Sequence, residues 1–590
     1  MDKQATLGFI LIGIVLVVWM SMNAPSPTQH PTTADSLSVV QTRPEKITPP
    51  ARSTTPPPAD STGKFFRGLE GGAEKRLVVT TDQYIAELST RGGMLRKWEL
   101  RKYLTWQKHP VHLVDYARGG DFSLLLSSAD GKLINTRTLN FAGDFPNWKA
   151  VTLSGTDSFS VDLVLSIGSG QRIVRRYTFF NGRYSFDSET IFENMQSAVA
   201  NFEYQIIWET GLPYAEANSV DESRFAKALA FSGGEVSDID AASEGDMPVR
   251  DISGTTDWVA IRNKYFTLAM IPDANQNQGA FLQGKHVPMP DHGVREEYSA
   301  AIKMPLRGNQ RESGRVTVYL GPLEFDEIKS YSRNLDKILE LGPAWIIRPI
   351  SEYVILPVLE FLRAIIPNFG VVIIVFSILI KIVLHPLTKS TLKSSRQMQA
   401  LQPLMTEIRE KHKDDPQKMN HAIMNLYKDY GINPAAGCLP LLLQMPILFA
   451  LYAVFSSSIE LRQANFFGWI HDLSIPDVVF TLPFTLPLFG IRDVSGLALA
   501  MGVTMFLQQK MTITDPRQKA MVWMMPIMMT LLFNSFPSGL NLYYFVFNVL
   551  SIVQQMWLNK KHGNEPLRKV DPKKAGGFMG RLTRDLPKLK

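Results

Sequence analysis

A single lysine interrupts an otherwise apolar run in the C-terminal half of the sequence. Lys381 stands in the segment FSILIKIVLHPLTK, about eight residues, or roughly 12 Å of helix, before Lys389. A charge at the centre of a bilayer costs about 2.5 to 3.5 kcal/mol, so an intramembrane lysine faces a partner or a water-filled cavity. The alternative is a side chain whose apolar stem carries the ammonium to the membrane surface. No acidic residue lies in the apolar segments of this half, so a substrate is a candidate partner.

Further polar side chains recur at depth in the same apolar segments. Together with the lysine they could line a wet groove. Each one alone is equally consistent with a hydrogen bond between helices, which is the commoner use of Ser, Asn and Gln in membranes. The candidates for the substrate groove are Lys381, Ser377, Gln444, Asn534, Asn548 and Ser551.

Five apolar segments of the C-terminal half read as membrane spans, and the segment Leu7 to Met22 reads as an uncleaved N-terminal anchor. The segment Val478 to Ile491 is expected to be a surface loop, because Pro483 and Pro487 interrupt it. The fourth and fifth spans, counted with the anchor as the first, are short, which favours a locally thinned bilayer. The five spans are Gly370 to Leu387, Ala435 to Phe455, Val494 to Gln508, Ala520 to Phe536 and Leu540 to Leu558.

The distribution of positive charge predicts the topology. Lys and Arg cluster in three places, at 389–428, at 510–519 and after 560, and the positive-inside rule assigns these to the cytoplasm. Six spans then place both termini in the cytoplasm and the large domain outside it. The basic tail is expected to bind anionic lipid, with ribosomal RNA as the alternative.

The residue composition and the pattern of apolar residues divide the chain into regions. Short alternating runs punctuated by glycine, such as FSVDLVLSIGSG, predict a large antiparallel β-sandwich. A Pro, Ser and Thr-rich stretch before it has too little apolar surface to fold. The predicted regions are an anchor at 1–22, a disordered linker at 23–63, the β-domain at 64–342, an interfacial amphipathic helix at 343–367, a five-helix core at 368–559 and a basic tail at 560–590.

Two elements of these regions have their own signals. The interfacial helix is apolar but carries charges and prolines, and a helix packed under the β-domain is the alternative reading. Residues 390–430 predict a cytoplasmic hairpin of two helices whose apolar stripes bury each other, with Asp415 as an N-cap, Pro416 in the first turn and Gly431 at the stop. This hairpin is either a docking arm or a stiff connector.

Enzyme signatures are absent from the sequence. There is no phosphate loop, no H-E-x-x-H metal pair and no G-x-S-x-G elbow. His385 and His471 are isolated, and the single cysteine, Cys438, cannot form an intrachain disulfide. We therefore expect no catalytic residues, no metal and no cofactor.

Four segments of the C-terminal half resemble signature segments of the bacterial YidC membrane protein insertases. They are HPLTKS from His385, NPAAGCLPLLLQMPILFALY from Asn433, WIHDLS from Trp469 and FPSGLNLYY from Phe536. The order of anchor, external β-domain, interfacial helix and five spans resembles the Gram-negative form of that family. STRGG and DWVAIRNKYF in the β-domain are weaker similarities.

The resemblance implies a multi-domain membrane protein with a large all-β periplasmic supersandwich, six transmembrane helices and a cytoplasmic helical hairpin, located in the inner membrane. It implies an insertase and chaperone for integral membrane proteins, with a hydrophilic groove that holds one basic residue. Lys381 occupies the position where the family usually has arginine, so the charge is kept but the planar five-donor fork is lost. The implied partners are nascent membrane proteins, the lipid bilayer, the Sec translocon and the ribosome, and no DNA.

The resemblance also implies a hydrophobic path along the third and fifth spans. The fifth span, AMVWMMPIMMTLLF, contains five methionines, and a flexible, polarisable Met-rich face accepts many apolar shapes, although core filling is the commoner use. The expected path residues are Met445, Phe449, Met525, Met528, Met529, Tyr543 and Tyr544.

Two other classes of function share some of these features. A secondary transporter would also hold a buried lysine, but the sequence shows no inverted repeat. An envelope carbohydrate-binding protein would act through the β-domain alone.

Overall fold

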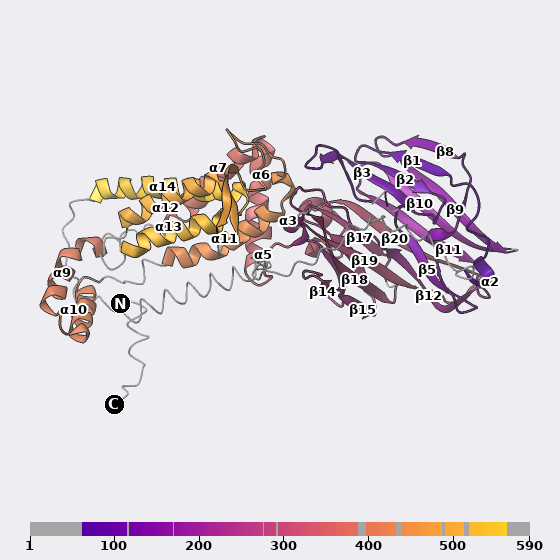
Figure 1. Cartoon of the computed structure of the whole chain (residues 1–590), viewed down its shortest axis with the longest axis horizontal. Helices are drawn as coiled ribbons and strands as arrows, with labels where there is room; N and C mark the ends of the chain where they lie inside the picture. Colours follow the sequence, from indigo (N-terminus) through magenta and orange to yellow (C-terminus); the bar gives the residue numbers. More distant parts are fainter. Residues whose placement is uncertain are drawn as a thin grey trace, which may run out of the picture. The chain divides into compact units, whose positions relative to one another are not determined.

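The computed structural model of the chain describes residues 62–114, 117, 119–168, 170–274, 276–290, 293–386, 397–431, 439–486, 490–512 and 519–562. These residues form two compact units, a β-rich one up to Glu340 and a mainly helical one from Leu341 onward (Figure 1). The predicted anchor, all but the last two residues of the linker and nearly all of the basic tail lie outside the described residues.

Three sheets build the β-rich unit, which confirms the predicted β-rich domain (Figure 1). All strand pairs are antiparallel except the parallel pair of β1 and β8. In spatial order the five-stranded sheet contains β4 (Pro110–His112), β3 (Leu95–Leu104), β2 (Tyr84–Ser89), β1 (Arg76–Thr80) and β8 (Trp148–Thr152). The six-stranded sheet contains β15 (Val249–Ser253), β18 (Gly279–Pro288), β19 (Val294–Pro305), β12 (Val199–Trp208), β5 (Ser123–Ser128) and β6 (Leu133–Asn135).

The largest sheet has nine strands and packs on the other two. Its side chains contact both, as the rings of Phe192 and Tyr204 show at 4.7 Å and those of Trp98 and Phe186 at 5.6 Å. In spatial order this sheet contains β14 (Glu235–Ile239), β13 (Lys227–Ser232), β16 (Thr256–Arg262), β17 (Phe266–Pro272), β20 (Arg311–Pro322), β11 (Ser185–Glu193), β10 (Gln171–Phe180), β9 (Ser158–Gly168) and β7 (Ala142–Gly143). Short helices decorate the unit: α2 (Gly63–Phe66), η2 (Thr136–Thr138), α3 (Ser219–Ser223), α4 (Phe325–Ser330) and η4 (Leu335–Ile338).

One buried tryptophan from each sheet marks the core. Trp98, Trp208 and Trp258 are fully buried. Each indole N–H donates to a backbone carbonyl, at 2.9, 2.9 and 3.2 Å respectively. Large aromatic side chains supply most of the apolar burial at such positions, and the paired N–H removes the penalty for burying a polar group.

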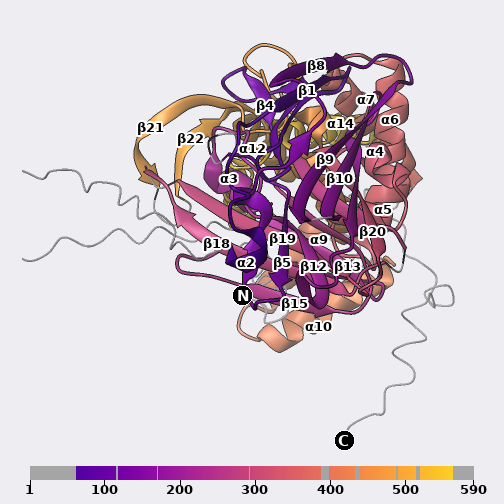
Figure 2. The same ribbon diagram turned by 90° about the vertical axis from the view of Figure 1, so that its right-hand side faces the viewer.

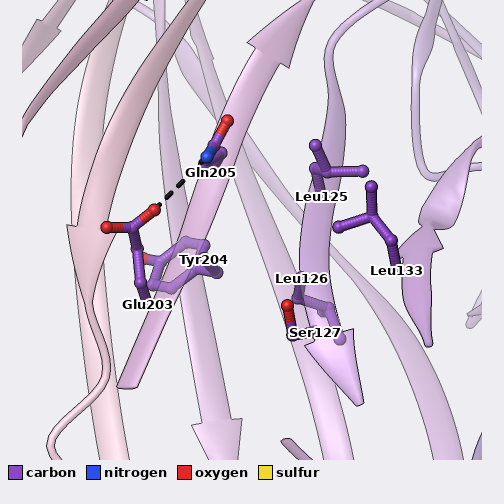
Figure 3. A pocket seen from close by; sticks show the side chains of 7 residues that line it. All are labelled: Leu125, Leu126, Ser127, Leu133, Glu203, Tyr204 and Gln205. Carbon is purple, nitrogen blue, oxygen red and sulfur yellow. Dashed lines mark hydrogen bonds between the residues drawn. The ribbon is translucent and has the colours of Figure 1, made fainter. Parts of the chain in front are cut away.

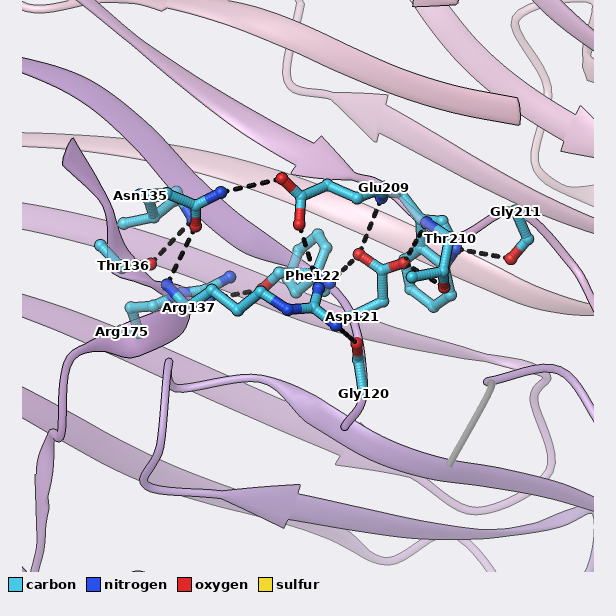
Figure 4. Close-up of polar contacts among 12 residues, drawn as sticks. Gly120, Asp121, Phe122, Asn135, Thr136, Arg137, Arg175, Glu209, Thr210 and Gly211 are labelled. Atoms are coloured by element: carbon cyan, nitrogen blue, oxygen red, sulfur yellow. Dashed lines mark hydrogen bonds and ion pairs between the residues drawn. The ribbon is translucent and has the colours of Figure 1, made fainter. Parts of the chain in front are cut away.

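The buried carboxylate of Asp121 connects the five-stranded sheet to the end of β12 in the six-stranded sheet (Figure 4). Asp121 accepts three backbone N–H groups at 2.7 to 2.8 Å, two of them from Glu209 and Thr210, and the Thr210 hydroxyl at 2.6 Å. Its own backbone pairs with that of Leu95 in the five-stranded sheet. Burial raises the pKa of the Asp121 carboxyl, and the hydrogen bonds from Thr210 and its neighbours oppose that change. Arg137 donates to Glu209 at 3.0 Å on the outer side of the same turn.

The second unit contains helices and one hairpin of strands. None of the helices in the described part of the chain combines the length and the apolar content needed to cross a bilayer. The six predicted spans are therefore not shown, and α7 and α13 have only 15 residues each against about 20 for a full span. The elements are α5 (Ile347–Ile350), η5 (Ser351–Ile355), α6 (Leu356–Ile365), α7 (Phe369–Val383), α9 (Gln402–Lys411), α10 (Pro416–Asp429), α11 (Leu439–Ser457), η7 (Ile459–Leu461), β21 (Val478–Leu486), β22 (Ile491–Ser495), α12 (Gly496–Thr512), α13 (Lys519–Phe533) and α14 (Ser538–His562).

The predicted interfacial helix corresponds to α5, η5 and α6, which follow one another without a break. One face, with Ile355 and Leu359, is buried, and the Ser351 hydroxyl is 3.5 Å from the carbonyl of Ala450 in α11. The opposite face exposes Tyr353 and Phe361. Apolar residues therefore lie on both faces of this helical segment. One face packs against the helical unit, and the other is exposed and available to the membrane interface.

The predicted helical hairpin is present as α9 and α10. Asp415 caps α10 by accepting the N–H groups of Gln417 and Lys418, as predicted. Gly431 has a φ of 64°, the left-handed conformation of a helix stop. Leu401 and Met405 are buried against a stripe of the second helix that consists of Ile423, Leu426, Tyr427 and Tyr430.

The prediction of a loop at Val478 to Ile491 is wrong. β21 and β22 form a two-stranded antiparallel hairpin there. The β-branched and aromatic residues of VVFT outweigh Pro483, because a proline without an N–H is tolerated in a strand that has a free edge.

A second buried acid of the β-domain predicts how stability depends on pH. Glu222 in α3 is fully buried, and burial raises its pKa from 4.5 to about 8, although the N–H groups of Glu216 and Ala215 oppose this. Between these two pH values the folded state holds a proton that the unfolded state releases. The free energy of unfolding should therefore fall as pH rises from about 5 to 8, by roughly 1 kcal/mol per pH unit. Burial also raises the pKa of Glu296 to about 7, which adds to the slope.

Glu222→Gln should reduce the slope of the free energy of unfolding against pH by the part that the proton of Glu222 contributes. The slope is measured by pulse proteolysis of the β-domain in guanidinium at pH 5, 6, 7 and 8. Glu235→Gln, the same change at an exposed position, should leave the slope as in the wild type. Equal slopes in the wild type and Glu222→Gln would show that Glu222 is ionised in the folded domain at neutral pH.

Candidate functional site

Lys381 of α7 points at α14. Its ammonium donates to the hydroxyl of Ser551 at 2.6 Å and lies 4.4 Å from the centre of the Phe547 ring. The Ser551 hydroxyl in turn donates to the carbonyl of Phe547 at 2.7 Å. Among the described residues, no carboxylate forms an ion pair with Lys381. A hydroxyl and an aromatic face stabilise an ammonium without neutralising it.

Two of the other groove candidates lie near this pair. Asn548, one turn before Ser551, reaches towards the Thr504 hydroxyl of α12 at 3.5 Å, so it bridges two helices. Ser377, one turn before Lys381, is fully buried and donates to the carbonyl of Ile373 at 2.7 Å. The hydroxyl hydrogen of Ser377 is thus committed to its own helix.

The remaining two groove candidates do not join Lys381. Asn534 accepts the N–H of Ser495 at 2.9 Å and donates to the carbonyl of Asp493 at 2.7 Å, just before α14 begins. Ser551 lies 13 residues after Ser538, the first residue of α14, or roughly 20 Å along it. Gln444 is half-buried on α11. The structure therefore pairs Lys381 with Ser551, with Asn548 and Ser377 one turn away from them, and it does not bring in Asn534 or Gln444.

The expected hydrophobic path divides into surface and core positions. Met528 of α13 is exposed, whereas Met445, Phe449, Met525 and Met529 are half-buried. Tyr543 and Tyr544 of α14 are buried, so they do not form an open surface. The exposed apolar face of α13 also contains Met524, one of the five methionines of the Met-rich segment, and Trp523 and Ile527, which sequence reasoning did not single out. Ile527 lies four residues after Trp523 and three after Met524, and this helical spacing is the signal that could have identified them.

A polar network that sequence reasoning missed lies at the end of the helices where α12 begins. Asp477 is buried and accepts the Trp469 indole N–H at 2.9 Å, the N–H of Leu497 at 2.8 Å and the Ser495 hydroxyl at 2.5 Å. Leu497 lies in the first turn of α12, where a negative charge is favourable. Asn541 of α14 reaches the same serine at 3.5 Å, so the network joins α12 to α14.

Different segments of the chain contact the two ends of α12. The Gln399 amide donates to the carbonyls of Met511 and Thr512 at 3.0 Å, which attaches the chain before α9 to the last turn of α12. The Asp477 network lies at the first turn of that helix. The α9–α10 hairpin and the Asp477 network are therefore at opposite ends of α12.

The β-domain has a cavity of about 170 Å³ between β5, β6 and β12 (Figure 3). Leu125 and Leu133 line one side, and Glu203 and Gln205, 3.2 Å apart, line the other. Ligand pockets usually measure about 300 to 1,000 Å³. Within the described residues, no group of His, Cys, Asp and Glu is arranged to hold a metal ion.

Comparisons with known proteins match both units. Residues 76–352 match the family described as the YidC periplasmic domain, and residues 361–565 match the 60Kd inner membrane protein family. A membrane protein insertase YidC from Chlorobaculum parvum is 38% identical over 570 residues, which is 96% of each chain. One from Chlorobium luteolum is 36% identical and covers 98% of this chain and 100% of its own.

Similar solved structures are more distant. A crystal structure described as an active YidC insertase has a TM-score of 0.34 and 19% identity, with coverage of 82% of this chain and 93% of that one. An alpha-N-acetylgalactosaminidase from Bifidobacterium bifidum has a TM-score of 0.29, 12% identity, and coverage of 49% of this chain and 40% of that one. Similarity at this level does not bear on activity.

A domain that matches the periplasmic-domain family, followed by a helical unit that matches an inner membrane protein family, defines the class of inner-membrane proteins with a periplasmic domain. The chain belongs to the YidC family of membrane protein insertases. These relatives support neither a secondary transporter nor an envelope carbohydrate-binding protein.

Removal of the Asp477 carboxylate should loosen the start of α12. Asp477→Ala leaves three donors without their acceptor, and each unpaired buried donor costs about 1 to 3 kcal/mol. We expect amide exchange of the first turn of α12 to accelerate in detergent-solubilised protein. Asp493→Ala, at an exposed position in the same hairpin, should leave this exchange unchanged. If the two variants exchange alike, the network does not hold α12.

Proposed function

We propose that this chain inserts nascent membrane proteins through the polar site at Lys381 and an apolar surface beside it. The observation that carries the proposal is the ammonium of Lys381, held by the Ser551 hydroxyl and the Phe547 ring without a carboxylate partner among the described residues. An ammonium in that setting favours an acidic or polar group that arrives from outside.

The first step is entry of the substrate's polar flank from the cytoplasm. Lys381 lies in the last turn of α7, and His385, four residues later, contacts the Gln554 amide at 3.0 Å. Polar groups thus continue from Lys381 to the end of α7 and lower the cost of moving a short polar segment inward. A lysine attracts a carboxylate as a point charge and lacks the bidentate geometry of arginine.

The second step is sideways release of the apolar part of the substrate. Trp523, Met524, Ile527 and Met528 form an exposed apolar face on α13. A substrate helix can slide along such a face into lipid, because methionine side chains adapt to many shapes. Burial of apolar surface at about 25 cal/mol per Å² supplies the driving force, so no nucleotide is required.

The proposed topology has six spans: the N-terminal anchor, α7, α11, α12, α13 and α14. Both termini lie in the cytoplasm, in agreement with the basic clusters around the α9–α10 hairpin, at Lys510 and after Lys560. α12 has 17 residues and α13 has 15, so the bilayer is thinned around them. The Sec translocon and the ribosome are proposed partners, and the basic tail is proposed to bind anionic lipid, with ribosomal RNA as the alternative.

The α9–α10 hairpin is the proposed receiver of the substrate. Its two helices bury Leu401 and Met405 between them, so the hairpin is a defined element rather than a loose connector. Gln399 ties it to the last turn of α12. It therefore lies at the same end of the helices as the entry to Lys381.

Substitutions of Lys381 test the proposed function. In proteoliposomes with a short single-span substrate that has an acidic external tail, Lys381→Arg should support insertion, Lys381→Ala should reduce it several-fold and Lys381→Glu should abolish it. The physical reason is attraction or repulsion of the tail in a medium of low dielectric constant. Lys285→Glu, the same charge reversal at an exposed β-domain position, should insert like the wild type. Equal insertion by all Lys381 variants would refute the role of this charge.

The receiver role predicts that unfolding the hairpin reduces insertion. Leu401→Gln places an amide in the fully buried contact between α9 and α10, at a cost of about 2 to 5 kcal/mol. Amide exchange in α10 should accelerate and insertion should fall. Thr406→Gln, on the exposed side of α9, should change neither. Faster exchange in α10 with unchanged insertion would show that the hairpin is only a connector.

A further inference from the structure

The β21–β22 hairpin exposes apolar side chains on both of its faces. Val478, Val479 and Phe480 follow one another and remain 46%, 43% and 50% exposed, and Phe484 is 58% exposed. Successive residues of a strand point to opposite faces. A folded protein partner would cover one face of this ribbon and leave the other in water, whereas lipid covers both.

The charge of the hairpin fits the same environment. The sequence from Val478 to Gly490 contains no Asp, Glu, Lys or Arg. The first charges are Arg492 and Asp493 on the returning strand, where the carboxylate of Asp493 accepts the Thr481 hydroxyl at 2.7 Å. Figure 2 shows the two strands as a ribbon that extends away from the body of α12. An apolar ribbon that carries its charges, Arg492 and Asp493, only on the returning strand resembles an interfacial segment more than a solvated loop.

Other exposed aromatic residues occur at the same end of the helices. Phe467 and Trp469 lie between α11 and the hairpin and are exposed. This turn contacts the start of α7, where the Asn368 amide donates to the carbonyl of Asn465 at 3.3 Å. Phe361 of the neighbouring α6 is also exposed. Aromatic side chains on several elements at one end of a helical unit form the belt that is typical of a membrane surface.

The backbone sets the depth of the hairpin. β21 has nine residues and β22 has five. The two strands form a sheet with no third strand among the described residues, so each of them has one open edge. Open edges are not tolerated in the hydrocarbon core, because their N–H and C=O groups would lack partners. Among the headgroups, water satisfies these groups while the side chains reach the upper acyl chains.

We propose that the β21–β22 hairpin is a shallow lipid anchor in the headgroup region of the outer leaflet, covered by lipid on both faces. It fixes the depth of α12, which begins directly after β22, and it lies at the end opposite the α9–α10 hairpin. This assignment rests on the topology given with the proposed function.

Nitroxide labels on adjacent residues test the proposal in full-length protein. In a Cys438→Ser background, Val479→Cys, Phe480→Cys, Phe484→Cys and Thr485→Cys are labelled in vesicles of phosphatidylethanolamine and phosphatidylglycerol. Collision rates with O₂, which concentrates in lipid, and with a water-soluble nickel chelate are compared. Leu133→Cys on the β-domain is the water reference and Val503→Cys on α12 is the lipid reference. Thr485 is an exposed polar position, where cysteine does not disturb packing.

The proposal predicts a ratio of O₂ to nickel collisions several-fold above that of Leu133→Cys at all four hairpin positions. Low collision with both reagents at Val479 but not at Phe480, or the reverse, would overturn it in favour of a protein partner on one face. Ratios equal to that of Leu133→Cys at every position would overturn it in favour of water. A low ratio at Val503→Cys would instead refute the proposed topology. Because the labels report without substrate, loss of insertion activity does not affect the result.

Discussion

The ammonium of Lys381 constrains the helical unit more than any other single group. It has a hydroxyl at 2.6 Å and an aromatic ring at 4.4 Å, and no ion pair within the described residues. An ammonium placed this way in an apolar region is costly unless water or an acidic group reaches it. The proposed function therefore requires that the surroundings of Lys381 stay open to one side. The side chains of His385 and Gln554, 3.0 Å apart, lie beyond the last turn of α7, on the side from which the proposed function brings the substrate.

The rest of the helical unit can be understood as support for that opening. The Asp477 network fixes the start of α12 and joins it to α14 at the end opposite the proposed entry, where the proposed function requires the unit to be closed. The buried contact of α9 with α10 keeps the helical hairpin at the end where the proposed entry lies. A closed end and an open end are what directional entry of a substrate requires. The β-domain, by contrast, is held by aromatic burial and by paired polar groups such as Asp121, and its cavity is small.

Some of these features could be predicted from the sequence, and others could not. The N-cap at Asp415 was predictable because capping depends on residues two and three positions away. Ser551 was a candidate, but its pairing with Lys381 joins residues 170 positions apart and needs the packing of α7 on α14. Asp477 was missed because its donors come from two directions along the chain. The β21–β22 hairpin was taken for a loop, because its two prolines were given more weight than its β-branched and aromatic residues.

The measurement that tests the central claim most directly is a charge exchange between protein and substrate. Two single-span substrates that differ only in an acidic or a basic external flank are inserted by the wild type and by Lys381→Glu in proteoliposomes without a membrane potential. If Lys381 receives the flank, the wild type favours the acidic substrate and Lys381→Glu favours the basic one. The same preference in both proteins would contradict the account, because the charge at position 381 would then not contact the substrate.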